Sequence, residues 1–168
     1  SFFTIYYMFT KPKRKIDRVF LHCSASSKPE HGDVDVIREW HQQRGWADIG
    51  YHYFIPFNGK LQVGRDIESI PAAQKGHNTG TIAICLHGLF THNFTLNQYE
   101  TLQILCKQIN IAYEDKVTFH GHSEVSNKAC PVFDYKSVLE LNDSGRIIGL
   151  ERPKILDMFD TGVDVMNL

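Results

Sequence analysis

The sequence lacks any regular pattern of cysteines. Its four cysteines are irregularly spaced and no CxxC pair occurs, which is not the arrangement of a disulfide framework. So few unpatterned cysteines are typical of a protein that folds in a reducing compartment. Cys85 and Cys106 fall in apolar runs, where we expect them to behave as small buried hydrophobic residues.

A long hydrophobic run and an excess of one charge are also missing. No segment is long enough to span a bilayer, and the formal net charge of −1 provides no overall basic field for nucleic acid. The apolar opening SFFTIYYMFT is followed by basic residues, whereas a secretory signal has the reverse order, and we predict a strand there. We therefore expect a protein that is synthesised in the cytoplasm without a signal peptide and contacts neither nucleic acid nor membrane directly. We also expect a monomer, although the sequence carries no specific signal of oligomeric state.

One local basic cluster is present, KPKRK at residues 11–15. Such a run is either a solvated turn or a contact for a phosphate or a protein partner. The solvated turn is the more common case and is the interpretation we favour.

What the sequence does contain indicates one globular domain. A chain of 168 residues with 42% apolar residues is long enough to bury a core. Strand-like runs alternate with amphipathic helices, and a hairpin is predicted around Asn58-Gly59. We predict an α/β (α+β) fold with a central mixed sheet flanked by helices. The predicted domain covers residues 1–141, and residues 142–168 form an extension that we do not assign.

The clearest predicted helix covers residues 94–114. Thr95 and Gln98 have the spacing of a capping box at its start. Its predicted apolar stripe comprises Leu96, Tyr99, Leu102, Cys106 and Ile109.

Three potential metal ligands follow two of the predicted strands. His22 ends the run RVFLH, His122 follows VTFHG, and Cys130 lies one short loop later. Side chains at the ends of neighbouring strands can converge in space. Two imidazoles and one thiolate match a catalytic zinc site, which keeps a fourth position open for water.

The spacing leaves alternatives open at this point. His120 could replace His122 or serve as a fourth ligand, because the two would share a face on a regular strand but not beyond a break at Gly121. Glu124 could orient a ligand imidazole, although a solvent-facing charge is the default expectation. Any one of the nine histidines is more often an ordinary hydrogen-bonded residue than a ligand.

Five segments occur in an order that resembles a known family. They are FLHCSAS, REWHQQRGWADIGYHYFI, NGKLQVGRD, KGHN and HSEVSNKACPVFD. Together they closely resemble the zinc-dependent N-acetylmuramoyl-L-alanine amidases, which share a fold with the peptidoglycan-recognition proteins. The resemblance covers residues 8–141, and the ordered set is specific where each segment alone is weak.

The resemblance implies functional roles for six residues. They are the zinc ligands His22, His122 and Cys130, the catalytic residues Tyr51 and Lys128, and the substrate-binding Asn78. We also expect the neighbouring Lys128 to help keep Cys130 deprotonated. One departure is Ala73, which stands where many relatives carry a histidine that lines the substrate groove.

The implied activity is zinc-dependent hydrolysis, with one Zn²⁺ per chain, of the amide between the lactyl group of N-acetylmuramic acid and L-alanine in peptidoglycan. A phage or prophage endolysin of this kind acts on the cell wall in the periplasm, so it requires export or a membrane lesion made by another protein. The alternative is a non-catalytic peptidoglycan-binding module, but such members typically lack the cysteine ligand that is present here as Cys130. The phage branch also suggests an additional role as an inhibitor of a phage RNA polymerase, which the zinc motif does not imply.

Overall fold

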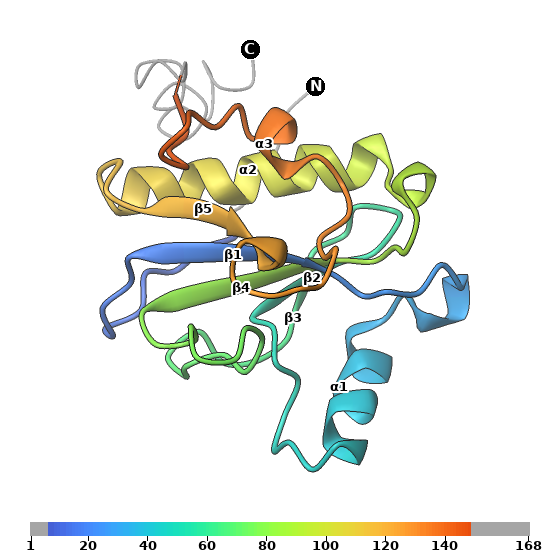
Figure 1. Cartoon of the computed structure of the whole chain (residues 1–168). Helices are drawn as coiled ribbons and strands as arrows, with labels where there is room; N and C mark the ends of the chain where they lie inside the picture. The colour runs from blue at the N-terminus through green and yellow to red at the C-terminus, as the bar shows by residue number, and fades with distance from the viewer. Residues whose placement is uncertain (1–6, 149–168) are drawn as a thin grey trace.

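A five-stranded mixed sheet forms the centre of the molecule (Figure 1). The computed structural model describes residues 7–148. The strands lie in the order β3-β2-β4-β1-β5, and every neighbouring pair is parallel except β2 with β3. Their bounds are β1 Arg18–Cys23, β2 Tyr53–Ile55, β3 Gln62–Val63, β4 Thr81–Leu86 and β5 Thr118–Gly121. The predicted mixed sheet is confirmed, and Asn58-Gly59 lies in the connection between the antiparallel pair β2 and β3.

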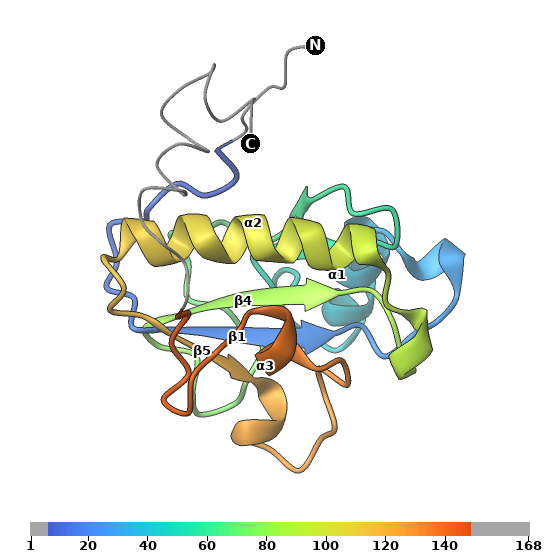
Figure 2. The same ribbon diagram turned by 90° about the horizontal axis from the view of Figure 1, so that it is seen from above.

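Helices lie on both sides of this sheet. α2 Leu96–Ala112 crosses one face, and α1 Val34–Gln43 lies on the opposite side (Figures 1 and 2). The short helix α3 Tyr135–Val138 and the 3-10 turns η1 Pro29–His31, η2 Thr91–Asn93 and η3 His122–Glu124 complete the fold. Among residues 7–148 no helix is long and apolar enough to cross a membrane.

The alternation of strand residues builds two separate apolar clusters. Leu21 of β1 and Ile84 of β4 point toward α2 and pack with Leu102 in the larger cluster. The smaller cluster lies on the face toward α1 and contains Ile37, Ile49, Phe54 and Cys85. Cys85 and Cys106 are fully buried free thiols, as predicted.

The sequence predicts the start of α2 correctly but not the whole of its buried stripe. Thr95 Oγ1 accepts from the Gln98 N–H at 3.2 Å, and Gln98 Oε1 accepts from the Thr95 N–H at 2.9 Å, which is the predicted capping box. The predicted stripe includes Leu96, but this first helical residue faces away from the sheet and is 83% exposed. Leu105, which was not in the predicted stripe, is fully buried.

The opening segment is tied to α2 instead of joining the sheet. Residues 1–6 lie outside the described residues, and residues 7–10 form no strand. The N–H groups of Met8 and Phe9 both donate to Gln108 Oε1, at 2.8 and 3.1 Å. The strand prediction is therefore wrong for the described part, because a side chain of α2 takes the place of a neighbouring strand.

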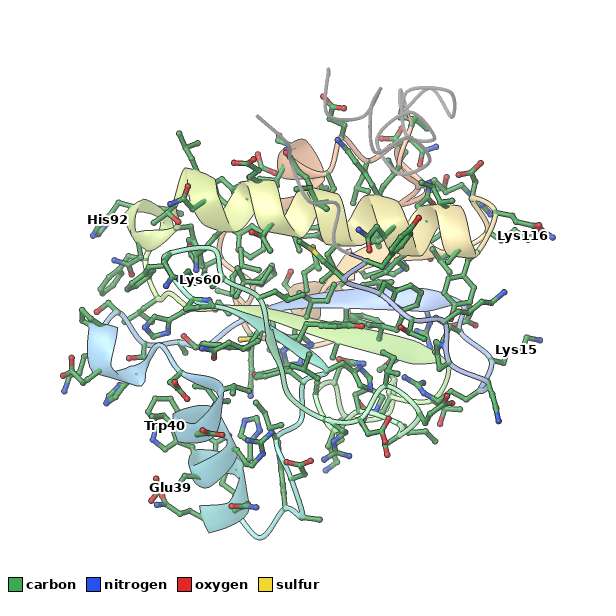
Figure 3. The ribbon with its side chains drawn as sticks, turned by 180° about the vertical axis from the view of Figure 1, so that it is seen from behind. Lys15, Glu39, Trp40, Lys60, His92 and Lys116 are labelled. Carbon is green, nitrogen blue, oxygen red and sulfur yellow. The ribbon has the colours of Figure 1, made fainter. Side chains whose placement is uncertain are left out.

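The basic cluster at residues 11–15 is only partly a solvated turn. Lys15 is exposed ahead of β1 (Figure 3). Arg14, however, reaches inward and donates to the carbonyl oxygens of Ile67 at 2.7 Å and Thr81 at 2.8 Å. Arg14 therefore anchors the segment before β1 to the start of β4.

Residues 142–148 of the predicted extension fold back onto β5. The Phe119 N–H donates to the Gly145 carbonyl at 2.7 Å, and Leu141 forms an antiparallel bridge with the buried Ile147. These contacts cover the outer edge of β5, which would otherwise present unpaired backbone groups. Residues 149–168 lie outside the described residues, and the domain boundary at residue 141 stays a prediction.

An ion pair ties α1 to the segment that leads into β2. Arg38 Nε lies 2.7 Å from Asp48 Oδ1. Burial alone would raise the pKa of Asp48, but the hydrogen bonds from Arg38 and from the Ile49 N–H outweigh it, and the pKa lies below its ordinary value of 3.8. The carboxylate therefore contributes stability above pH 3.8 that is lost as the pH falls through the lowered pKa.

We expect Asp48→Asn to lower the free energy of unfolding by less than about 1 kcal/mol at neutral pH, because 39% of the side chain is exposed and the pair is screened. The difference from the wild type should shrink below pH 3.8. Urea unfolding at about pH 7 and about pH 3 measures both effects. The matched control is Asp35→Asn, which removes the 82% exposed second partner of Arg38 and should have a smaller effect. A difference that did not change with pH would contradict the electrostatic origin.

Candidate metal centre

The three predicted ligands meet at the carboxyl ends of the parallel strands β1 and β5, which lie side by side in Figure 1. His22 is on β1, His122 opens η3 directly after β5, and Cys130 lies beyond the following loop. Their ligand atoms are all within 4.8 Å of one another. His22 Nδ1 is 3.7 Å from Cys130 Sγ, and the ring centres of His22 and His122 are 4.7 Å apart.

This donor set fits a zinc ion. A tetrahedral ion with Zn–S of about 2.3 Å and Zn–N of about 2.0–2.1 Å places neighbouring donor atoms about 3.3–3.6 Å apart. The 3.7 Å between His22 Nδ1 and Cys130 Sγ is close to that separation. Imidazole and thiolate are ligands that zinc favours, and three protein ligands leave one position for water or substrate.

His22 is held as a neutral imidazole. Its side chain is 1% exposed. The pKa of His22 is lowered to about 3, mainly by burial and secondly by the nearby His122. Its Nε2 lies 2.8 Å from Gln74 Oε1, so that its other ring nitrogen faces Cys130. A metal ion would therefore meet an imidazole that has no proton to displace at neutral pH.

Cys130 differs from His22 because it requires a cation to become a thiolate. The Cys23 N–H donates to Cys130 Sγ at 3.2 Å, which favours a charged sulfur. The hydrogen bond with the Cys23 thiol and burial nevertheless raise the pKa of Cys130. The expectation that Lys128 helps keep this thiol deprotonated stays a prediction, and a bound ion would displace the thiol proton.

The structure separates His120 from His122. β5 ends at Gly121 and the chain turns into η3, so the alternation of the strand no longer relates the two rings. His120 Nδ1 lies 3.0 Å from Glu124 Oε1, while Glu124 Oε2 accepts from the Gly121 N–H at 2.8 Å and from the Tyr135 hydroxyl at 2.5 Å. Glu124 is exposed, as expected by default, but its carboxylate also fixes the turn after β5. The imidazole that it orients is His120.

Tyr51 lies beside the ligands, two residues before β2. Its ring centre is 5.0 Å from that of His22 and 5.4 Å from that of His41. Burial raises the pKa of the Tyr51 hydroxyl well above its usual range, so it is protonated and able to donate at neutral pH. His41, on α1, is not among the site residues predicted from the sequence. The structure shows that its Nδ1 accepts from the Gly50 N–H at 2.8 Å, which supports the segment that carries Tyr51.

Two adjoining cavities open beside the ligands. One of about 170 Å³ is lined in part by Tyr51, Lys128 and Cys130. A wider one of about 620 Å³ shares Trp46, His122 and Lys128 with it. Lys128 is exposed at the point where the cavities meet. The arrangement places one hydroxyl donor and one cation next to the candidate metal position.

Asn78 and Gln74 shape one wall of the site. Asn78 lines the wider cavity, and its Oδ1 accepts from the N–H groups of Ala73 at 3.0 Å and Gln74 at 2.9 Å. Its contact with substrate stays a prediction. Sequence reasoning missed Gln74, because nothing in PAAQKGHN distinguishes it from a surface glutamine, yet it is fully buried against His22.

Comparison with known sequences places this fold and site in a family. Residues 12–133 match the family described as N-acetylmuramoyl-L-alanine amidase. The chain is 37% identical over 139 residues to the endolysin of Escherichia phage T7, covering 79% of this chain and 91% of that protein. It is 35% identical over 141 residues to the endolysin of Klebsiella phage KP32, covering 80% of this chain and 92% of that protein.

Solved structures agree with this placement. The Ph2119 endolysin from the Thermus scotoductus MAT2119 bacteriophage Ph2119 has a TM-score of 0.67 at 26% identity, over 80% of this chain and 88% of that one. A second match is a chain in the complex of the peptidoglycan recognition proteins LCa and LCx with tracheal cytotoxin. Its TM-score is 0.64 at 25% identity, and the match covers 74% of this chain and 81% of that one. The chain belongs to the N-acetylmuramoyl-L-alanine amidase family. It is an N-acetylmuramoyl-L-alanine amidase, and its substrate is peptidoglycan.

We expect Gly121→Ala to damage the site through packing. An added Cβ would lie 2.5 Å from Tyr135 Cε1 and 2.9 Å from Pro131 Cδ, between the segments that carry His122 and Cys130. The free energy of unfolding should fall by about 1–3 kcal/mol, the usual cost of overpacking. Chemical denaturation measures it.

The reference for this prediction is Gly45→Ala. Gly45 differs from Gly121, whose φ is −90°, in having a positive φ of +87°, and an added Cβ there meets no atom within 4 Å. Its cost should be limited to about 1–2 kcal/mol of backbone strain. Gly121→Ala should in addition weaken metal binding, and the packing argument fails if metal affinity is the same in both variants.

Proposed function

We propose that this amidase is a zinc-dependent endolysin that holds one Zn²⁺ per chain with His22, His122 and Cys130. The observation that carries the proposal is the convergence of three zinc-type donor atoms within 4.8 Å at the ends of two parallel strands. The phage relatives, which are named endolysins, support a role in wall lysis. The bond cleaved is the amide that joins the lactyl group of N-acetylmuramic acid to L-alanine.

Tyr51 and Lys128 are the catalytic residues of this proposal. When bound, zinc would polarise the scissile carbonyl and acidify the attacking water. The protonated Tyr51 hydroxyl can donate to the carbonyl oxygen as that oxygen gains negative charge. Lys128, at the junction of the two cavities, supplies a positive charge toward the same oxygen.

The wider cavity is the proposed position of the stem peptide. Asn78 lines it, and its Oδ1 is already occupied by the N–H groups of Ala73 and Gln74. We therefore propose that Asn78 binds peptide through its Nδ2, which can donate to a peptide carbonyl.

Two further proposals concern the place of action and a second partner. Peptidoglycan lies outside the inner membrane, so we propose action in the periplasm after export or after a membrane lesion made by another protein. Inhibition of a phage RNA polymerase stays a prediction that rests on the resemblance alone. Unimpaired transcription in vitro at high protein excess would remove it.

We expect Tyr51→Phe to lower the rate of amide cleavage by about 10²- to 10³-fold, the usual cost of one donor to a developing oxyanion. Zinc content should not change, because Tyr51 is not a proposed ligand. The assay is the release of new amino termini from purified peptidoglycan. Tyr53→Phe is the matched control, because Tyr53 points to the opposite face of the sheet. Full activity in Tyr51→Phe would remove this residue from the mechanism.

Cys130→Ser tests the metal site itself. We expect zinc and cleavage to be lost together, because a serine hydroxyl is a much poorer zinc ligand than a thiolate. Elemental analysis and the amino-terminus assay on the same samples measure both. Cleavage that persists without zinc would refute the mechanism. Zinc-loaded wild type that binds muropeptides without cleaving them would instead support the binding module.

A further inference from the structure

Gln74 is fully buried (0% exposed) behind His22 and makes three polar contacts through its side chain. Gln74 Oε1 lies 2.8 Å from His22 Nε2. Gln74 Nε2 donates to Thr81 Oγ1 at 2.8 Å and to the His77 carbonyl oxygen at 3.2 Å. Leaving a polar group unpaired at such a buried position is costly, so these contacts constrain the whole arrangement.

The partners of the Gln74 amide determine which of its atoms donates and which accepts. The Thr81 hydroxyl donates its one hydrogen to the Asn78 carbonyl at 2.7 Å, so its oxygen accepts from Gln74. The His77 contact is a carbonyl oxygen, which can only accept. Gln74 must therefore turn its amide NH₂ toward Thr81 and His77, and its carbonyl oxygen toward His22.

The tautomer of His22 follows from this orientation. Gln74 Oε1 carries no hydrogen, so the hydrogen of the contact must be on His22 Nε2. The lone pair of the neutral imidazole is then on Nδ1, the nitrogen that lies 3.7 Å from Cys130 Sγ. We propose that Gln74 is a positioning residue that fixes His22 as the Nε2–H tautomer and so presents Nδ1 to the metal ion. The proposal rests on the zinc site proposed above.

The surrounding structure is built to hold Gln74 in place. Asn78 Oδ1 accepts from the Gln74 N–H at 2.9 Å, which fixes the backbone of the loop. Thr81 is the first residue of β4, and β4 pairs in parallel with β1, the strand that carries His22. His22 and Thr81, the residue that orients the Gln74 amide, therefore belong to the same sheet. Partners that orient a ligand imidazole in this way typically change metal affinity by about 10- to 100-fold.

The test combines side-chain nitrogen-15 NMR with zinc affinity, both on the full chain. In the wild type, before and after zinc loading, we expect the hydrogen of His22 on Nε2. Gln74→Met keeps the length of the side chain but removes Oε1. Its zinc affinity, measured by competition with a chelator, should fall about 10- to 100-fold.

Gln98→Met is the matched control. Gln98 is also 0% exposed, and its amide bonds to the backbone of Thr95, Ile55 and His87 at the start of α2. This variant also loses buried hydrogen bonds, but it should bind zinc as the wild type does. A purely structural role for Gln74 would make the two variants alike in zinc affinity, and a positioning role separates them.

Two results would overturn the role of Gln74. One is a hydrogen on His22 Nδ1 in the wild type, and the other is equal zinc affinity in Gln74→Met and the wild type. A wild type that takes up no zinc would instead overturn the proposed metal site, and the tautomer of the metal-free chain would still decide the role of Gln74. If Gln74→Met does not fold, the wild-type NMR measurement decides alone.

Discussion

The site depends on the parallel pairing of β1 with β5. Their register aligns Leu21 with Gly121, so His22, still within β1, and His122, the first residue after β5, lie at the same level. The carbonyl of Cys130 accepts a backbone N–H from η3 at 2.7 Å, which returns the third ligand to the same place. A slip of one residue would turn His22 to the other face. The sheet pairing therefore positions the ligands before any metal ion is bound.

Burial acts in opposite directions on two of these ligands. It lowers the pKa of His22, which is thereby ready to bind a cation. The hydrogen bond with the Cys23 thiol, and after it burial, raises the pKa of Cys130, which would release its proton on binding a metal ion. Binding of zinc would thus release a proton and become more favourable as the pH rises. Burial therefore keeps His22 neutral and able to bind a cation, whereas it helps keep Cys130 protonated until a metal ion binds.

The sequence was sufficient to predict features that depend on a local residue pattern or on where strands end. The Thr95 capping box follows from the local spacing of Thr95 and Gln98, and the convergence of the ligands follows from strands that end in polar residues. The choice of His122 over His120 needed the family resemblance as well. The sequence was insufficient where a long-range partner decides. Only the fold shows that Gln74 lies against His22, 52 residues away, because a buried glutamine and a surface glutamine have the same local sequence signal.

The two faces of the sheet have different roles, one in stabilising the fold and the other in carrying the site. The face toward α2 is packed with apolar side chains, and its burial supplies most of the hydrophobic stabilisation. The opposite face carries buried polar residues, among them His22, His52, Gln74 and Thr81. Each is hydrogen-bonded; His52 Nδ1, for example, accepts from the Ala83 N–H at 3.1 Å. Because packing on the α2 face already stabilises the fold, these polar groups can orient the side chains of the site. Removing one of their hydrogen-bond partners should disturb the geometry of the site before it unfolds the chain.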